Sequence, residues 1–236
     1  MPLAMPKRNR PAPSLRQEHA LRRAGYRLVA GVDEAGRGAW AGPVVAAAVI
    51  LPSCHCIASE LRGVHDSKQL TPAQRTLMRE RIQRAALAWS VGSASSAEID
   101  ALGILPATRL AMMRAVTDLQ PAPDVLLIDA VSLPELDVPQ RAFPYADAIS
   151  LSVAAASILA KTTRDALMCD LDALVGGYGF AAHKGYGTRA HAEALTSLGP
   201  CWAHRHTFRP VMAVVRGDRS SEHRAKIAAL RSASRN

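Results

Sequence analysis

Two short apolar runs flank an acidic pair and a glycine-rich turn within residues 27–51, and this stretch constrains the fold most strongly. Residues 28–32 are apolar and carry two valines, which favours a buried strand. Asp33 and Glu34 follow directly, and glycines and a proline then break the chain before a second apolar run at 44–51. The pattern predicts two strands joined by a tight glycine-rich link, with two carboxylates at the end of the first strand.

The acidic pair has two interpretations. Asp33 and Glu34 are either an exposed turn at the strand end or oxygen ligands for a hard divalent cation. Adjacent strand residues point to opposite faces of a sheet, so both carboxylates can share one ion only where the strand twists or ends. Gly36, two residues later, favours such an end, and the longer Glu side chain extends its reach.

The net charge of +9 indicates an anionic partner, nucleic acid first. The basic excess lies in residues 1–26 and 212–236, whereas residues 27–211 hold equal numbers of acidic and basic side chains. Two explanations of the charge are therefore equally good: basic tails that only keep the chain soluble, and basic tails that bind DNA. The expected organisation is a flexible basic tail at 1–25, one folded domain at 26–212 and a basic tail at 213–236.

The cysteine pattern and the absence of long apolar runs indicate a cytoplasmic protein. Cys54, Cys56, Cys169 and Cys201 show no framework spacing, so we expect free thiols, with zinc at Cys54-His55-Cys56 as the less favoured alternative. No run reaches the ~18 apolar residues of a membrane helix, and the N-terminus has no secretory apolar segment. Monomer is the default expectation.

Strands lie early in the chain and helices follow, with one further strand among them, which predicts a mixed α/β domain. Thr71 followed by a proline predicts a helix start. Residues 124–129 read as a buried strand that ends in an acid, Asp129, and Asp147 precedes a long alanine-rich helix at 148–174. Taken alone, each acid is most simply a turn residue or a helix N-cap.

Five motifs together resemble bacterial ribonuclease HII, the type 2 ribonuclease H. They are GVDEAGRG followed by AGPVVAAAVIL, VLLIDA, ADAISLSVAAASILAKTTRDALM, YGFAAHKGYGTRAH and GPCWAHRHTFRPV, in that order. The resemblance covers about residues 26–212. It implies the ribonuclease H-like architecture, a mixed sheet whose first strands form an antiparallel meander joined to parallel strands, flanked by helices in a single domain.

The chemistry of phosphodiester hydrolysis explains why such a chain would carry four carboxylates. The reaction needs an activated water and a stabilised leaving 3′-oxygen, and two divalent ions about 3.5–4 Å apart supply both. Mg²⁺ and Mn²⁺ prefer oxygen ligands, and bound cations offset the repulsion among the acids. The residues expected to be catalytic and to hold two Mn²⁺ or Mg²⁺ ions are Asp33, Glu34, Asp129 and Asp147.

Selection of ribonucleotides must depend on the 2′-hydroxyl, the group that distinguishes RNA from DNA. Glycines let a backbone approach a sugar closely, and the resemblance implies that Gly36-Arg37-Gly38 reads this hydroxyl. It also implies that Tyr186 packs on the sugar of the next, deoxy, nucleotide; the alternative is an ordinary partly buried tyrosine. The candidate phosphate contacts, otherwise solvated surface lysines, are Lys68 and Lys184.

Three positions depart from the family pattern. Ala39 stands where a proline is usual, Ala130 where glycine is common, and Ile149 where a lysine is usual. Loss of that lysine predicts a weaker substrate or backbone contact. Ser157 and Lys161, one helical turn apart, are interpreted as structural or phosphate-facing.

The combined pattern predicts a cytoplasmic, metal-dependent endoribonuclease. It would cut the RNA strand of RNA–DNA hybrids and cut duplex DNA 5′ of a single embedded ribonucleotide, leaving a 3′-hydroxyl and a 5′-phosphate. Its expected role is ribonucleotide excision repair of replicated DNA. The alternatives are a non-catalytic hybrid-binding protein and a metallophosphatase of small phosphates. Whether a sliding-clamp partner binds stays open.

Overall fold

The structure is a computed structural model, and it describes residues 12–54, 56–64 and 71–217. The chain divides into two compact units, a division that the sequence analysis did not predict. Among the described residues, the sheet unit comprises 12–35, 44–54, 56–64, 71–94 and 108–163, and the C-terminal unit comprises 36–43, 95–107 and 164–217.

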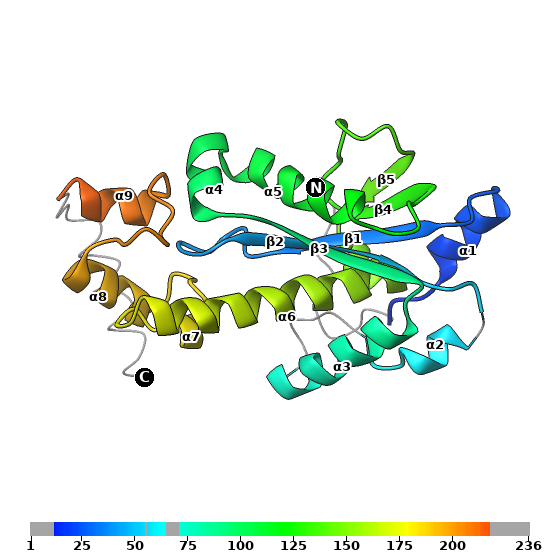
Figure 1. Ribbon diagram of the computed structural model, residues 1–236, viewed down its shortest axis with the longest axis horizontal. Coiled ribbons are helices and arrows are strands. Elements are labelled where there is room, and N and C mark those ends of the chain that lie inside the picture. The colour runs from blue at the N-terminus through cyan, green and yellow to red at the C-terminus, as the bar shows by residue number, and fades with distance from the viewer. Residues whose placement is uncertain (1–11, 55, 65–70, 218–236) are drawn as a thin grey trace, which may run out of the picture. The chain divides into compact units, whose positions relative to one another are not determined.

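A five-stranded mixed sheet forms the centre of the sheet unit, in the order β3-β2-β1-β4-β5 (Figure 1). The β1–β2 and β2–β3 pairs are antiparallel, and the β1–β4 and β4–β5 pairs are parallel, so the predicted meander with parallel strands is confirmed. The connection between β1 and β2 runs from residue 36 to residue 43, which is longer than the predicted tight link. The strands are β1 (Val29–Ala35), β2 (Val44–Ile50), β3 (Ala88–Ala94), β4 (Val125–Asp129) and β5 (Gln140–Phe143).

Two helices cover opposite faces of the sheet (Figure 1), α5 (Ile104–Thr117) and α6 (Leu151–Leu174). The predicted helix at 148–174 begins at Leu151, after a short 3₁₀ turn, η2 (Ala146–Ala148). Helix α6 packs directly on the backbone of β1, because a Cβ at Gly31 would lie 2.2 Å from the Ser152 carbonyl carbon. The alanines of its first turns are fully buried, so the seam between helix and strand is filled by small side chains.

An N-terminal helix, α1 (Arg16–Arg23), lies within the segment that was predicted to be a flexible tail. Leu21 is buried in an apolar cluster, and the carboxylate of Glu18 is fully buried. Glu18 Oε1 accepts hydrogen bonds from the Ser150 hydroxyl at 2.6 Å and the Ser152 hydroxyl at 2.7 Å. The prediction of a tail to residue 25 is therefore wrong for this helix, because its few apolar side chains and its buried acid find partners far along the chain.

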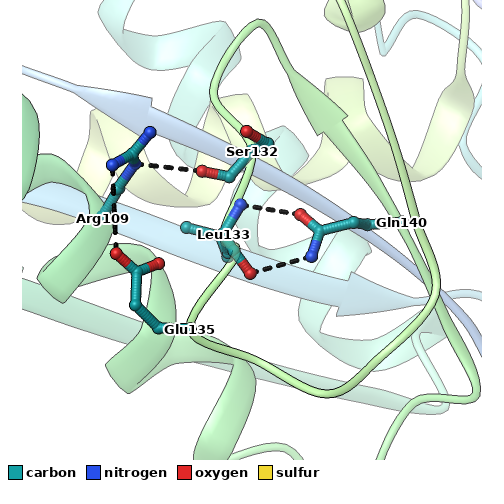
Figure 2. A network of polar contacts seen from close by, with 5 residues as sticks. All are labelled: Arg109, Ser132, Leu133, Glu135 and Gln140. Carbon is teal, nitrogen blue, oxygen red and sulfur yellow. Dashed lines mark hydrogen bonds and ion pairs between the residues drawn. The ribbon is translucent and has the colours of Figure 1, made fainter.

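Side chains of Gln140 in β5 and Arg109 in α5 bind the backbone of the connector between β4 and β5 (Figure 2). The Gln140 amide accepts a hydrogen bond from Leu133 N–H at 2.7 Å and donates one to the Leu133 carbonyl at 2.8 Å. Arg109 of α5 donates to the Ser132 carbonyl at 3.1 Å and pairs with Glu135 at 3.9 Å. A hydrogen bond and an ion pair thus attach the connector that follows Asp129 to helix α5.

Helix α3 (Pro72–Ala85) starts where the sequence predicted. Thr71 is its N-cap and forms a capping box with Gln74, whose side chain accepts the Thr71 N–H at 2.8 Å. The remaining helix of the sheet unit is α2 (Ile57–Glu60).

The C-terminal unit is built from short helices around an apolar cluster that includes Ala41, Met168 and Phe180. Helix α8 begins after its N-cap Thr188 and ends at Leu198, with Gly199 as its C-cap. Helix α9 was not predicted, and it extends into the segment assigned to the C-terminal tail. The helices are α4 (Ser96–Leu102), α7 (Phe180–His183), α8 (Arg189–Leu198) and α9 (Arg209–Val215).

Cys54 and Cys56 are joined by a disulfide, so the prediction of free thiols is wrong for this pair. Cys169 and Cys201 are free, as predicted. His55, the central residue of the alternative zinc site, lies outside the described residues. Within the described ranges, the helices are all too short or too polar to span a membrane.

Candidate active site

Two of the predicted acids lie next to each other because the strands that carry them are parallel neighbours. Val32 of β1 is paired with Ile128 of β4, so Asp33 and Asp129 follow at the same level of the sheet. Parallel strands present their carboxyl ends at one edge, and both acids stand at that edge. Asp33 is 5% exposed although it is ionisable.

The turn η2 brings the fourth acid to this edge. Ala146 N–H donates a hydrogen bond to Asp129 Oδ1 at 2.9 Å, and Asp147 is the next residue. Asp147 is buried, at 6% exposure. Left-handed backbone at Ala130 (φ 57°) and Tyr145 (φ 62°) turns the chain on either side of this contact. The resemblance implied a glycine at position 130, and glycine adopts a positive φ such as that of Ala130 without steric cost.

The buried Asp33 carboxyl is the electrostatic centre of the cluster. Burial raises its pKa well above the usual range, and the charges of Glu34 and Asp129 raise that pKa further. Hydrogen bonds from Ser157 and from Glu34 N–H, the latter 2.7 Å from Asp33 Oδ1, act in the opposite direction. Hydrogen bonds therefore orient the ionised carboxyl, while burial and the neighbouring acids destabilise its negative charge. A nearby cation would stabilise that charge.

The donor set fits a hard divalent cation in its chemistry, since all four side chains are carboxylates. In the described part of the chain, however, no three His, Cys, Asp or Glu side chains converge closely enough to form a ready metal cluster. The structure thus brings the four acids to one region of the sheet unit, and their role as metal ligands stays a prediction.

The Gly36-Arg37-Gly38 turn belongs to the C-terminal unit, where a buried arginine holds its carbonyl groups. Arg205 is fully buried. It donates to the carbonyl of Gly36 at 2.8 Å, of Arg37 at 2.9 Å and of Gly42 at 3.0 Å. Burial lowers the pKa of Arg205 to about 9, and the positive charge of Arg164 also lowers it.

Arg164 is the second buried guanidinium, and it joins the same loop to the Lys184 region. It donates to the carbonyl of Pro43 at 2.9 Å, of Lys184 at 2.9 Å and of Ala41 at 3.1 Å. Burial lowers the pKa of Arg164 too. Both arginines lie within the quoted family motifs, but sequence reasoning assigned neither of them a role, because their partners are backbone carbonyls that leave no mark in the side-chain pattern.

The two glycines of the turn are needed for different reasons. Gly36 has a φ of +95°, and a Cβ there would lie 2.0 Å from Arg164 Nε. Gly38 has no positive φ, it is exposed, and a Cβ there would meet nothing within 4 Å. Packing within the chain therefore explains Gly36, whereas no contact among the described residues explains a need for glycine at 38.

Two further predicted substrate residues, Tyr186 and Lys184, lie near this loop. The Tyr186 ring is half-buried and lies over the Arg164 guanidinium, 5.3 Å from ring centroid to Cζ. Lys184 has left-handed backbone (φ 53°), and its Nζ lies 2.9 Å from Cys169 Sγ. Lys68 lies outside the described residues, so its predicted phosphate contact stays a prediction.

Comparison with known proteins supports one family. The family model for ribonuclease HII matches residues 30–211. Ribonuclease HII of Roseiflexus castenholzii is 57% identical over 200 residues, which are 84% of this chain and 89% of that protein.

Two solved structures share the fold. Ribonuclease H2 from Pyrococcus horikoshii OT3 matches with a TM-score of 0.69 and 28% identity, covering 82% of this chain and 100% of that one. The RNase HII in the PCNA:RNase HII complex from Archaeoglobus fulgidus matches with a TM-score of 0.63 and 27% identity, covering 75% of this chain and 92% of that one. The chain therefore belongs to the ribonuclease HII family, and it is a nuclease of the ribonuclease H type.

Proposed function

We propose that this nuclease hydrolyses the RNA strand of RNA–DNA hybrids and cuts duplex DNA on the 5′ side of a single embedded ribonucleotide. The products are a 3′-hydroxyl and a 5′-phosphate. The observation that carries the proposal is the buried Asp33 beside Asp129 at the ends of two parallel strands, with Asp147 following a residue bonded to Asp129. Cytoplasmic action in ribonucleotide repair belongs to the same proposal.

The four carboxylates would hold two Mg²⁺ or Mn²⁺ ions, which when bound activate the attacking water and stabilise the leaving oxygen. The protein's own contribution is to fix the carboxylates before substrate arrives. Ser157 and Glu34 N–H orient Asp33, and Ala146 N–H orients Asp129. Such preorganisation spares the reaction the free energy of aligning the groups.

Recognition of the ribonucleotide would rest with the C-terminal unit. Carbonyl groups of Gly36 and Arg37 are occupied by Arg205, and the surface at Gly38 is open. A sugar could approach the Gly38 backbone closely enough to exchange hydrogen bonds with its 2′-hydroxyl. Tyr186 would pack on the adjacent deoxyribose, and Lys184 would contact a phosphate.

The experiment is cleavage of a labelled DNA duplex that contains one ribonucleotide, with Mg²⁺ or Mn²⁺, by the wild type and by Asp33→Asn. A nick just 5′ of the ribonucleotide, absent with the variant and absent on an all-DNA duplex, is the expected result. Binding without cleavage in either metal would instead support a non-catalytic hybrid-binding protein. Equal cleavage by Asp33→Asn would place the catalytic acids elsewhere.

Gly38→Ala tests recognition separately from chemistry. The variant should unfold at the wild-type temperature, because the added methyl group meets nothing within 4 Å in the described part of the chain. It should nevertheless cut the ribonucleotide duplex more slowly, because the methyl group occupies the space through which the sugar approaches. Wild-type cleavage by this variant would remove the turn from the proposed recognition of the 2′-hydroxyl.

The Archaeoglobus fulgidus relative was solved with PCNA, which favours a clamp-type partner for this protein as well. Binding to such a partner would be measured with the full chain, since residues 218–236 lie outside the described structure.

A further inference from the structure

Three histidine side chains of the C-terminal unit pack against one another beside Tyr186. The rings of His183 and His191 stack with centroids 4.4 Å apart, and His191 Nε2 lies 3.1 Å from His204 Nε2. His191 and His204 are fully buried. None of these imidazoles has a role in the proposed hydrolysis, so their arrangement needs its own explanation.

The backbone groups at the two ends of the His204–His191 pair determine where the protons lie. The Tyr186 carbonyl can only accept, and it lies 3.0 Å from His191 Nδ1, so Nδ1 carries the proton. At the other end Cys201 N–H can only donate, and it lies 3.1 Å from His204 Nδ1, so that nitrogen is the acceptor.

Both ends lead to the same arrangement in the middle. A neutral His204 that accepts at Nδ1 must carry its proton at Nε2. A neutral His191 with its proton at Nδ1 must accept at Nε2, and the contact between the two Nε2 atoms is then one normal hydrogen bond. The chain of bonds therefore has a single direction, from Cys201 N–H through His204 and His191 to the Tyr186 carbonyl.

His183 holds the neighbouring peptide in the same manner. Its Nε2 lies 2.8 Å from the Tyr178 carbonyl and donates to it, while its Nδ1 accepts Gly185 N–H at 3.2 Å. The dipeptide Gly185-Tyr186 is thus bound at its N–H by one imidazole and at its carbonyl by another. A Cβ at Gly185 would lie 2.4 Å from the Ala41 carbonyl oxygen, so this dipeptide has little room to shift.

A proton added to His191 or His204 would place two N–H groups face to face. Burial is the largest influence on both groups, and it lowers the pKa of each to about 4. The charges of neighbouring histidines act in the same direction: His183 on His191, and His191, His206 and His183 on His204. Both imidazoles are consequently neutral at physiological pH, as the direction of the hydrogen bonds requires.

We propose that His204 and His191 are positioning residues that form a neutral relay of fixed tautomers and hold the Tyr186 backbone for recognition of the RNA–DNA junction. This inference rests on the proposed function, because Tyr186 is the residue that would pack on the deoxyribose. With its carbonyl fixed and its ring over Arg164, Tyr186 needs no reordering when substrate binds.

Two variants of His191 separate the relay from simple filling of space. An Asn amide can place its NH₂ near the position of Nδ1 and still donate to the Tyr186 carbonyl. A Gln amide reaches the position of Nε2, where it can accept from His204, but it removes the imidazole donor from the Tyr186 carbonyl, which keeps only the Thr188 N–H at 2.8 Å. Both residues are neutral, polar and of similar size, so each is the control for the other.

The activity test measures KM and kcat of His191→Asn and His191→Gln on a duplex with one ribonucleotide and on a continuous RNA–DNA hybrid. We expect His191→Gln to lose about tenfold in preference for the single-ribonucleotide duplex, mostly through KM, as for one lost hydrogen bond. His191→Asn should stay within about threefold of the wild type. Equal preference in the two variants would overturn the inference.

Nitrogen-15 NMR of the wild-type histidines tests the relay without any variant. The expected spectrum at pH 7 has His191 protonated at Nδ1 alone and His204 protonated at Nε2 alone. The opposite tautomer, or an imidazolium at either position, would overturn the relay. Failure of the wild type to cut the single-ribonucleotide duplex would count against the proposed function, and the NMR spectrum would still decide whether the relay exists.

Discussion

Replacing Gly36 with alanine should destabilise the protein far more than the same change two residues later. The backbone at Gly36 has a φ of +95°, which costs an L-residue about 1–2 kcal/mol. The new Cβ would also lie 2.0 Å from Nε, 2.5 Å from Cδ and 2.8 Å from Cζ of Arg164. These separations are too short for any contact, so the guanidinium must move.

Displacement of Arg164 adds the larger share of the cost. Its Nε bond to the Pro43 carbonyl, at 2.9 Å, is the first to be lost, and a buried hydrogen bond from a charged donor contributes about 1.5–3 kcal/mol. The combined expectation is a loss of about 3–5 kcal/mol in the free energy of unfolding. For a chain of this length that corresponds to a fall in Tm of roughly 6–20 °C.

Urea and thermal denaturation of Gly36→Ala and Gly38→Ala provide the comparison. Gly38→Ala is the matched control, because it adds the same methyl group to the same turn with nothing within 4 Å. It should unfold within about 0.5 kcal/mol of the wild type. If Gly36→Ala were as stable as this control, the arrangement of Arg164 around the turn would be refuted.

Three further perturbations have defined outcomes. Asp33→Asn should raise the Tm of the metal-free protein at pH 7, because the pKa of Asp33 is raised and its ionised form therefore destabilises the native state at a pH above the ordinary carboxyl pKa. The same variant should abolish the rise in Tm that added Mn²⁺ produces in the wild type. An unchanged Mn²⁺ effect would count against this carboxylate as a ligand. The free energy of unfolding should fall as the pH is lowered from about 6.5 to about 4. In that range His191 and His204 take up protons in the unfolded chain but not in the native state, where their pKa values are about 4. Urea midpoints of the wild type that stay constant across this range would contradict the lowered pKa values. Ala130→Gly should leave the free energy of unfolding unchanged or raise it by up to about 1 kcal/mol, because the residue has a φ of 57°. A loss of more than about 1 kcal/mol in urea denaturation would mean that the Ala130 methyl group makes a stabilising contact.

Local patterns made the sheet and its acids predictable from sequence. Apolar runs are short-range signals, and β1, β2 and β4 lie where such runs predicted strands; those of β1 and β4 lead into acids. Their neighbours Asp33 and Asp129 consequently came together as expected. Strand β5, at Gln140–Phe143, leaves a weaker signal in the sequence, because its partly and fully exposed side chains carry little of the apolar pattern.

Long-range partnerships account for what the sequence did not predict. Glu18 is buried through hydrogen bonds to Ser150 and Ser152, more than a hundred residues away, so a polar segment that looked like a tail is a docked helix. Arg164 and Arg205 bind backbone carbonyls, which every residue carries and no motif reveals. Which ring nitrogen carries the proton in His204 and in His191 depends on the atoms that face each nitrogen, and the sequence does not give these partners.

The glycines beneath the two covering helices restrict how this fold can adapt to heat. Gly31 lies against the backbone of α6, and Gly92 lies against α5, where a Cβ would be 2.2 Å from the Ala111 carbonyl oxygen. Larger apolar side chains, a common way to add stability, cannot enter these seams because main-chain atoms have no rotamer to change. Relatives adapted to higher temperature would therefore have to gain their stability from helix caps, shorter loops and surface charge networks rather than from a bigger core.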